Sequence, residues 1–235
     1  MTLAPRGVLQ GILWDMDGTS IDSAPLWNTG IRAAAAEMGV EWDESDDAVV
    51  RGHGMWSVAA RFRQKKATLT DAVETVALIE RHTVESAIIM SPVWLPGVRE
   101  LLEACAGEGV RCALVTMSGR RSVEAILGDS GLDLFDVIVS GSDVAQPKPH
   151  PEPYLTGMDR LGLAADSCVA LEDSLVGITA AVAAGVTTIA VNAPAAVQVT
   201  GPVVRWQSLS GRSLDDVRDV HAAASPGART GGDAA

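Results

Sequence analysis

The fold is decided by Gly11-Ile12-Leu13-Trp14-Asp15-Met16-Asp17-Gly18-Thr19, an apolar run that ends in two aspartates. The apolar half predicts a buried strand, and residues two apart on a strand face the same way. Asp15 and Asp17 therefore leave the strand together, and Gly18 permits a sharp turn behind them. Two carboxylates this close repel each other unless a cation or a shared proton relieves the repulsion. The pattern suits a metal site in which one carboxylate attacks and the other moves protons.

Two simpler interpretations of this stretch have to be weighed. Asp and Gly are common turn residues, so a plain turn stays open on this stretch alone. A calcium-binding loop would need Gly at its sixth position and Glu at its twelfth. Counted from Asp15, the fourth position is Gly18 and the twelfth is Leu26, so the calcium-loop pattern is not met.

Composition limits the range of partners. The chain has 235 residues, of which 47% are hydrophobic and 20% charged, and its formal net charge is -12. Nucleic acid and anionic membranes are disfavoured as partners because both require basic surfaces. A small anionic substrate is compatible with this charge if a local site supplies the positive group. Three cysteines in apolar contexts and a start without a signal-peptide pattern predict a cytoplasmic protein, which we expect to be a monomer.

The order of patterns along the chain predicts a core with an insertion. Helical spacing dominates residues 24–92, whereas apolar runs alternate with helical patterns from Pro96 onward. Such alternation is typical of an α/β fold, here a doubly wound, Rossmann-like parallel sheet covered on both faces. We expect this core in residues 1–20 and 94–220, an inserted α-helical cap in residues 21–93, and a disordered tail in residues 221–235. The strands are expected at residues 11–14, 111–116, 137–140, 167–171, 187–191 and 203–206.

Further polar residues follow later predicted strands. Thr116 ends an apolar run before a helix, Lys148 lies in a segment with three prolines, and Glu172-Asp173 follows another strand. Each has a simpler explanation: Thr116 and Asp173 could cap helices, and Lys148 could be a surface lysine. The carboxyl ends of parallel strands share one edge of the sheet, where active sites of such folds lie. Their common placement therefore favours a single site with oxygen ligands for Mg²⁺ and a fixed cation for an anionic substrate.

These motifs together resemble the haloacid dehalogenase superfamily. Asp-Met-Asp-Gly-Thr is similar to the first motif of that family, Thr116 to its second, and Lys148 in Lys-Pro-His-Pro-Glu-Pro-Tyr to its third. Glu172-Asp173-Ser174 with Gly177 is similar to the fourth motif. The resemblance covers about residues 10–192, and the insertion resembles the small α-helical cap of the β-phosphoglucomutase-like phosphatases.

The resemblance implies a role for each of these positions. Asp15 would be the nucleophile that becomes an aspartyl phosphate, and Asp17 the general acid and base. The phosphate would be bound by Thr116, the backbone of Met117, and Lys148. The Mg²⁺ cofactor would be held by Asp15, the backbone carbonyl of Asp17, and Asp173, with Glu172 assisting through water.

The same resemblance implies a metal-binding hydrolase, a Mg²⁺-dependent phosphatase acting on a small phosphorylated metabolite such as a sugar or polyol phosphate. The presence of Asp17 disfavours dehalogenation, because the dehalogenases of the family lack the second acid. A β-phosphoglucomutase-like isomerase and a non-catalytic phosphate-binding protein stay open as alternatives. The mutases carry a histidine ten residues after the second aspartate, where this chain has Trp27. Trp27 therefore favours hydrolysis.

Positions in the expected cap are candidates to contact the leaving group of the substrate. They combine charge, aromatic surface and a helical context, but each could equally be a solvated or packing residue. The candidates are Arg51, His53, Trp56 and Arg63.

Overall fold

The computed structural model describes residues 8–50, 54–68, 71–90, 93–194 and 203–224. The chain forms two compact units, which are described separately. Unit 1 comprises Met1–Ile21, Trp94–Ser118 and Asp129–Ala235, and unit 2 comprises Asp22–Val93 and Gly119–Gly128. Residues 119–128 thus group with unit 2, although the sequence analysis assigned them to the core. None of the helices within the described ranges is both long and apolar enough to cross a membrane.

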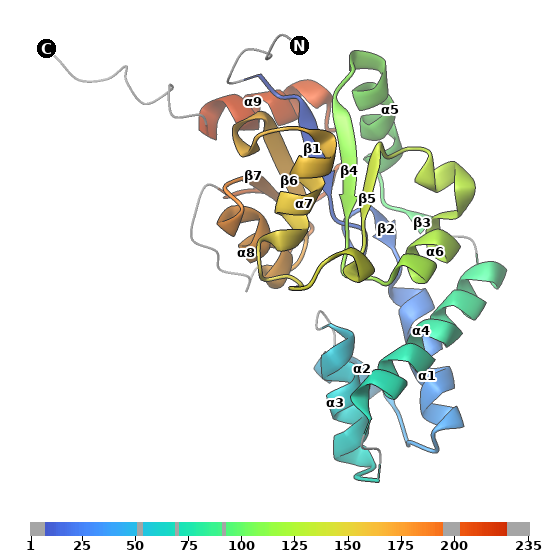
Figure 1. Ribbon diagram of the computed structural model, residues 1–235. Coiled ribbons are helices and arrows are strands. Elements are labelled where there is room, and N and C mark those ends of the chain that lie inside the picture. Colours follow the sequence, from blue (N-terminus) through green and yellow to red (C-terminus); the bar gives the residue numbers. More distant parts are fainter. Residues whose placement is uncertain (1–7, 51–53, 69–70, 91–92, 195–202, 225–235) are drawn as a thin grey trace, which may run out of the picture. The chain divides into compact units, whose positions relative to one another are not determined.

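A six-stranded parallel sheet forms the centre of unit 1 (Figure 1). Its strands have the spatial order β5-β4-β1-β6-β7-β8, with β1 in the interior of the sheet. In register, Leu13 lies beside Ala113 on one side and Ala170 on the other. The strands are β1 (Gly11–Trp14), β4 (Arg111–Val115), β5 (Val137–Val139), β6 (Cys168–Glu172), β7 (Thr187–Val191) and β8 (Val203–Trp206).

Helices cover both faces of this sheet, which is why its central strands are apolar except at the end residues Arg111 and Glu172. Helices α7 (Glu152–Leu161) and α8 (Leu175–Ala183) pack together on one face, and α5 (Val98–Glu108) and α9 (Leu214–Ala224) pack together as a second pair. A buried cluster joins Leu13, Val115 and Ala170 of the sheet to Tyr154 and Met158 of α7. The predicted α/β fold with a doubly wound parallel sheet is thereby confirmed.

The strand order fixes where side chains converge in unit 1. From β1 the chain adds β4 and β5 on one side, and then β6, β7 and β8 on the other side. The order therefore reverses beside β1, and such a switch point opens a crevice at the carboxyl ends of the strands. The residues directly after β1, β4 and β6 lie at this edge.

Unit 2 is helical, as its spacing predicts. It contains α1 (Ala24–Glu37), α2 (Glu44–Val50), α3 (Met55–Lys65) and α4 (Ala72–Ile89), together with the first part of α6 (Arg120–Leu132), which bends at Gly128. Trp27, Ile31, Phe62 and Ile79 belong to its buried apolar cluster. Two short strands, β2 (Ile21–Asp22) and β3 (Val93–Trp94), pair with each other where the chain passes between the units.

A buried aspartate links two helices of unit 2. The Asp46 carboxylate on α2 accepts a hydrogen bond of 2.9 Å from Nε of Arg61 and forms an ion pair with Lys65, both on α3. Burial alone would raise the pKa of Asp46, but the hydrogen bonds from Lys65, the Asp43 backbone and Arg61 lower it to about 2. The carboxylate therefore stays charged and paired near neutral pH.

The chain stays ordered beyond the point where the sequence predicts a tail. The prediction placed the disordered tail from His221, but residues 221–224 form the last turn of α9. The His221 side chain is buried, and its Nε2 lies 2.9 Å from the carbonyl oxygen of Asp166. The amphipathic spacing of Leu214, Val217 and His221 explains the difference, because it turns one face of α9 toward the sheet.

A glycine allows the close approach of α1 and α4. A Cβ atom at Gly30 would lie 2.1 Å from Oγ1 of Thr83 and 2.8 Å from its backbone nitrogen. We expect Gly30→Ala to lower the free energy of unfolding by about 1–3 kcal/mol through overpacking. Urea titration followed by circular dichroism measures this change.

Gly107→Ala in α5 is the matched control, because the added Cβ atom would meet nothing within 4 Å beyond its chain neighbours and its own helix backbone. That helix should keep its stability or gain up to about 1 kcal/mol from the better helix propensity of alanine. Equal stabilities of Gly30→Ala and the parent protein would show that α1 and α4 can separate without cost.

Candidate active site

The loop after β1 is fixed by its own hydrogen bonds. The backbone nitrogen of Asp15 donates to the carbonyl oxygen of Leu171 at 3.0 Å, which extends the pairing with β6 by one residue. The Ser20 hydroxyl donates to the Asp15 carbonyl oxygen at 2.6 Å, and the Gly18 nitrogen donates to the Ile21 carbonyl oxygen at 2.9 Å. The backbone that carries both aspartates is therefore held in place before any ligand binds.

Gly18 makes room for an acid from another strand. Its φ angle is 87°, in the left-handed region that favours glycine. A Cβ atom at Gly18 would lie 2.2 Å from Oδ2 of Asp173. Only glycine satisfies both conditions, so this turn brings the Asp173 carboxylate against the loop that carries Asp15 and Asp17.

Lys148 stands at the centre of the site, and its side chain is only 3% exposed. Its Nζ donates to Oδ1 of Asp15 at 2.8 Å, to the carbonyl oxygen of Val115 at 2.8 Å and to Oε1 of Glu172 at 2.5 Å. An ammonium group has three donors, and these acceptors use all three. The lysine therefore joins β1, β4 and β6 through a single charged atom.

Glu172 is held from both of its oxygens. Oε1 accepts from the Tyr154 hydroxyl at 2.5 Å as well as from Lys148, and Oε2 accepts from the Ser174 hydroxyl at 3.1 Å. A Cβ atom at Gly177 would lie 1.8 Å from Oε1, so the carboxylate packs directly on the glycine of α8. With these partners, Glu172 is placed to orient Lys148.

Asp17 is contacted by two hydroxyls from the loop after β4. Its Oδ2 accepts from the Ser118 hydroxyl at 2.7 Å and from the Thr116 hydroxyl at 3.2 Å. The Ser118 backbone nitrogen in turn donates to Oγ1 of Thr116 at 3.1 Å. Thr116 and Ser118 are both buried, so these contacts are shielded from bulk water.

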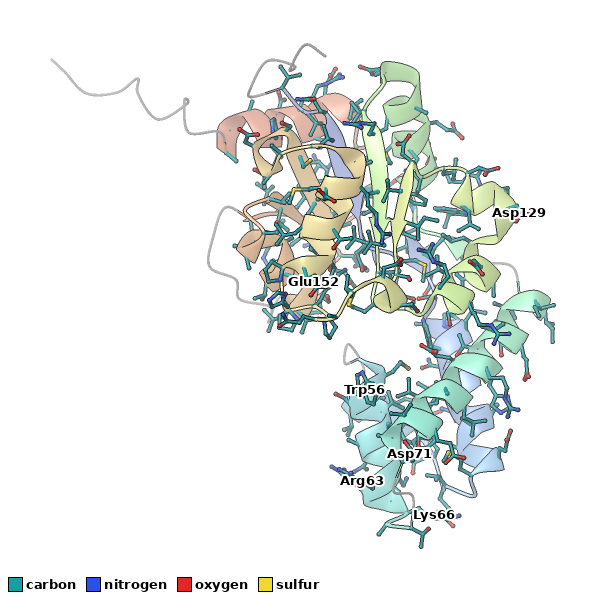
Figure 2. The ribbon with its side chains drawn as sticks, viewed as in Figure 1. Trp56, Arg63, Lys66, Asp71, Asp129 and Glu152 are labelled. Atoms are coloured by element: carbon teal, nitrogen blue, oxygen red, sulfur yellow. The ribbon has the colours of Figure 1, made fainter. Side chains whose placement is uncertain are left out.

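The segment that carries Lys148 is held at its two sides. Glu152, which lies at the start of α7 (Figure 2), accepts hydrogen bonds of 2.8 and 3.0 Å from the backbone nitrogens of Ala145 and Gln146. The Lys148 backbone nitrogen lies 3.3 Å from the sulfur of Met117, to which it donates a hydrogen bond. Met117 thus contacts the lysine segment with its side chain and leaves its backbone nitrogen available for a ligand contact.

Negative charge exceeds positive charge at this site. Burial raises the pKa of Asp15 well above its ordinary value, and Glu172 raises it further against the opposing effect of Lys148. Burial, followed by the charge of Glu172, also raises the pKa of Asp173 to about 7. Burial by itself would lower the pKa of Lys148, but Asp15 and Glu172 raise it, so the lysine stays charged.

The arrangement fits a hard divalent cation. One oxygen each of Asp15, Glu172 and Asp173 can be chosen so that all three lie within 4.8 Å of one another. All are oxygen ligands, and both aspartates are raised in pKa, the state expected of acids that lack a neutralising charge. Glu172 already accepts from Lys148, Tyr154 and Ser174, but a carboxylate oxygen can accept a further contact, so all three acids stay candidate ligands.

The structure brings the acids, the threonine and the lysine of the four motifs to one edge of the unit 1 sheet. Tyr154 and Ser118 also belong to this network, although the sequence analysis did not select them as site residues. Tyr154 had a signal as the last residue of Lys-Pro-His-Pro-Glu-Pro-Tyr, and Ser118 as a second hydroxyl two residues after Thr116. Neither signal is distinct from an ordinary core tyrosine or a helix cap.

The structure describes two of the candidate substrate contacts of unit 2. Arg51 and His53 lie outside the described residues. Trp56 at the start of α3 is 58% exposed, and Arg63 further along α3 is also exposed (Figure 2). Their exposure leaves both side chains able to meet a ligand, so contact with substrate stays a prediction.

Comparison with known proteins identifies the family. The family model of haloacid dehalogenase-like hydrolases matches residues 12–191, and the chain belongs to this family. The predicted family is thereby confirmed. Its members are hydrolases, so this is the class of enzyme to which the chain belongs.

Three relatives show the range of similar proteins. Hexitol phosphatase B of Escherichia coli (strain K12) is 34% identical over 203 residues, which cover 82% of this chain and 87% of that protein. The phosphorylated carbohydrates phosphatase of Thermotoga maritima is 32% identical over 187 residues, covering 76% of this chain and 82% of that protein. The crystal structure of CbbY from Rhodobacter sphaeroides with xylulose-(1,5)bisphosphate has a TM-score of 0.77 at 25% identity, covering 88% of this chain and 98% of that chain. These names support the expected class of phosphoric monoester hydrolase.

The raised pKa of Asp173 gives a prediction for the metal-free protein. Folding raises this pKa from its ordinary value near 3.8 to about 7, so between these values the folded state binds more protons than the unfolded state. Stability should therefore fall as the pH rises through this window. Replacing the acid by Asp173→Asn should stabilise the protein at pH 8, by on the order of 1–3 kcal/mol, with the gain shrinking toward pH 4.

Urea unfolding in EDTA at several pH values measures this difference. Asp133→Asn, which replaces an exposed carboxylate of unit 1, is the control and should show no such trend. A gain from Asp173→Asn that is independent of pH would contradict the burial of an unneutralised acid at this position.

Proposed function

We propose that the protein is a Mg²⁺-dependent phosphatase that hydrolyses a small sugar or polyol phosphate through an aspartyl phosphate on Asp15. The observation that carries this proposal is the shared environment of Asp15. It combines a buried ammonium at 2.8 Å, a neighbouring acid suited to a metal, and a second aspartate held by two hydroxyls. This set supplies a nucleophile, positive charge and a proton carrier in one place.

The phosphate group would be bound by the loop after β4 and by Lys148. The Thr116 hydroxyl and the backbone nitrogen of Met117 offer donors to its oxygens. All three donors of Lys148 already have partners, so its contact with phosphate requires the exchange of one of them. A fixed cation is most effective where negative charge rearranges in the transition state.

The reaction proceeds in two displacements. A carboxylate oxygen of Asp15 attacks phosphorus, the bond from phosphorus to the ester oxygen breaks, and the Asp17 carboxyl gives its proton to the leaving alcohol. Asp17 then takes a proton from water, whose oxygen attacks phosphorus and breaks the bond to Asp15. Inorganic phosphate leaves, and both aspartates return to their starting protonation states.

Mg²⁺ would be held by Asp15 and Asp173, together with the backbone carbonyl of Asp17, and Glu172 would act through Lys148 and Ser174. When bound, the ion supplies the positive charge that lets a carboxylate approach a phosphate dianion. The protein contributes the positions of the oxygens, since Gly18 and Gly177 leave room for the acid side chains and Lys148 and Tyr154 donate hydrogen bonds to them.

The substrate class is inferred from the relatives. Two of them are named as phosphatases of hexitols or phosphorylated carbohydrates, and a third was crystallised with a sugar bisphosphate. A phosphorylated sugar or polyol is therefore the first class to examine. The alternative of an isomerase has no support from Trp27, which is 9% exposed and belongs to the apolar cluster of unit 2.

The first test is release of inorganic phosphate from a panel of hexitol, hexose and pentose phosphates. We expect turnover with Mg²⁺, loss of turnover in EDTA, and recovery when Mg²⁺ is added back in excess. Asp15→Asn should reduce kcat by about 10⁴-fold or more, because an amide cannot accept the phosphoryl group.

The far-UV circular dichroism spectrum of Asp15→Asn serves as the control for folding, and it should match that of the parent protein. Turnover of the parent protein in metal-free buffer would contradict the proposed metal site. Near-parent turnover by Asp15→Asn would remove the covalent route instead, so the two failures are distinct.

Hydrolysis and isomerisation differ in their products. A mutase must protect the aspartyl phosphate from water while the sugar phosphate reorients in the site. Trp27 offers only a donor N–H and bulk for this purpose. We expect β-glucose 1-phosphate, with a trace of glucose 1,6-bisphosphate, to give no glucose 6-phosphate. Phosphorus NMR follows all species at once, and accumulation of glucose 6-phosphate without inorganic phosphate would make the protein an isomerase.

The remaining expectations stay predictions. They are the cytoplasmic location, the monomeric state, the lack of nucleic-acid and membrane partners, and the division into a core of residues 1–20 and 94–220 and a cap of residues 21–93.

A further inference from the structure

Ser118 contacts the residue that carries the proton in the proposed reaction. Its hydroxyl donates to Oδ2 of Asp17 at 2.7 Å, a normal length for a bond from a hydroxyl to a carboxylate oxygen. The Thr116 hydroxyl approaches the same oxygen at 3.2 Å. Of these two contacts, the one from Ser118 is shorter and therefore stronger.

Phosphate binding separates the roles of the two hydroxyls. A hydroxyl has one proton to donate, so Thr116 cannot donate to Asp17 and to a phosphate oxygen at the same time. In the proposed function Thr116 turns to the phosphate. Ser118 has no such competing task, and its hydroxyl can stay on Asp17 throughout the reaction.

The backbone around Ser118 is fixed, which gives its hydroxyl a defined position. The Ser118 nitrogen donates to Oγ1 of Thr116 at 3.1 Å, and the Ser118 carbonyl oxygen accepts from the Gly141 nitrogen at 3.0 Å. A Cβ atom at Gly141 would lie 2.4 Å from the carbonyl oxygen of Met117. The loop after β4 therefore rests on the segment that follows β5, and the serine is only 8% exposed.

We propose that Ser118 is a positioning residue for Asp17. Its hydroxyl holds one carboxyl oxygen, so that the other oxygen can present its proton to the ester oxygen as that bond to phosphorus breaks. The inference rests on the proposed phosphatase function and goes beyond it by adding a residue that acts through Asp17. It predicts that the loss of Ser118 harms proton transfer more than substrate binding.

Two esters with different leaving groups test this role. p-Nitrophenolate leaves as a stable anion, whereas the alkoxide of a polyol phosphate needs a proton from Asp17. The ratio kcat/KM covers the steps through cleavage of the ester, so it isolates the step in which Asp17 is the acid. Ser118→Ala should lower kcat/KM for the best polyol phosphate by about 10- to 100-fold, and for p-nitrophenyl phosphate by less than about 3-fold.

Three further variants separate positioning from structure. Ser118→Thr keeps the hydroxyl and should restore most of the rate with the polyol phosphate. Asp17→Asn should show the same dependence on leaving group, and adding Ser118→Ala to it should cost little more, because the two residues act as one unit. If Ser118→Ala does not fold, Ser118→Cys, which keeps the shape but donates weakly, takes its place in the comparison.

The outcomes distinguish failure of this inference from failure of the proposed function. No phosphate release by the parent protein from either ester would refute the proposed function. If the parent protein releases phosphate but Ser118→Ala lowers kcat/KM equally for both esters, or for neither, the positioning role is overturned. Additive losses in the double variant would overturn it as well, since they would show that Ser118 acts apart from Asp17.

Discussion

The buried ammonium of Lys148 is the contact on which the rest of the site depends. It lies among Asp15, Glu172 and the carbonyl oxygen of Val115, which belong to three neighbouring strands or their ends. Taking charges out of water is costly unless each is paired and hydrogen-bonded. Tyr154 and Ser174 complete the bonding of Glu172, so the lysine has a fixed partner that does not leave when Asp15 reacts.

This arrangement leaves more negative than positive charge at the site. One lysine faces Asp15, Glu172 and Asp173, and the consequence is a raised pKa at both aspartates. An acid that is difficult to ionise without a nearby cation becomes a good ligand once a cation neutralises it. The fold therefore stores electrostatic repulsion at the sheet edge, and a divalent cation relieves this repulsion where the nucleophile lies.

Much of this could be predicted from the sequence, for a physical reason. Parallel strands buried on both faces read as apolar runs, and polar residues just after such runs must lie at one edge. That reasoning selected Asp15, Thr116, Lys148 and Asp173. It did not select Tyr154, because a tyrosine in an apolar helix face looks like core, and only the position of Glu172 gives its hydroxyl a partner. His221 was missed in the same way, because its partner is a backbone carbonyl 55 residues away in sequence.

Glycines explain why the acids could be placed from short motifs. Asp173 occupies space that a side chain at Gly18 would fill, and Glu172 occupies space that a side chain at Gly177 would fill. Gly18 of the first motif therefore admits a carboxylate of the fourth, whereas Gly177 admits a carboxylate of its own motif. Without Asp173, the space beside Gly18 would stay unfilled. Without a glycine at position 18, the Asp173 carboxylate would clash with the turn. The first and fourth motifs are informative together because the turn at Gly18 provides the volume that Asp173 requires.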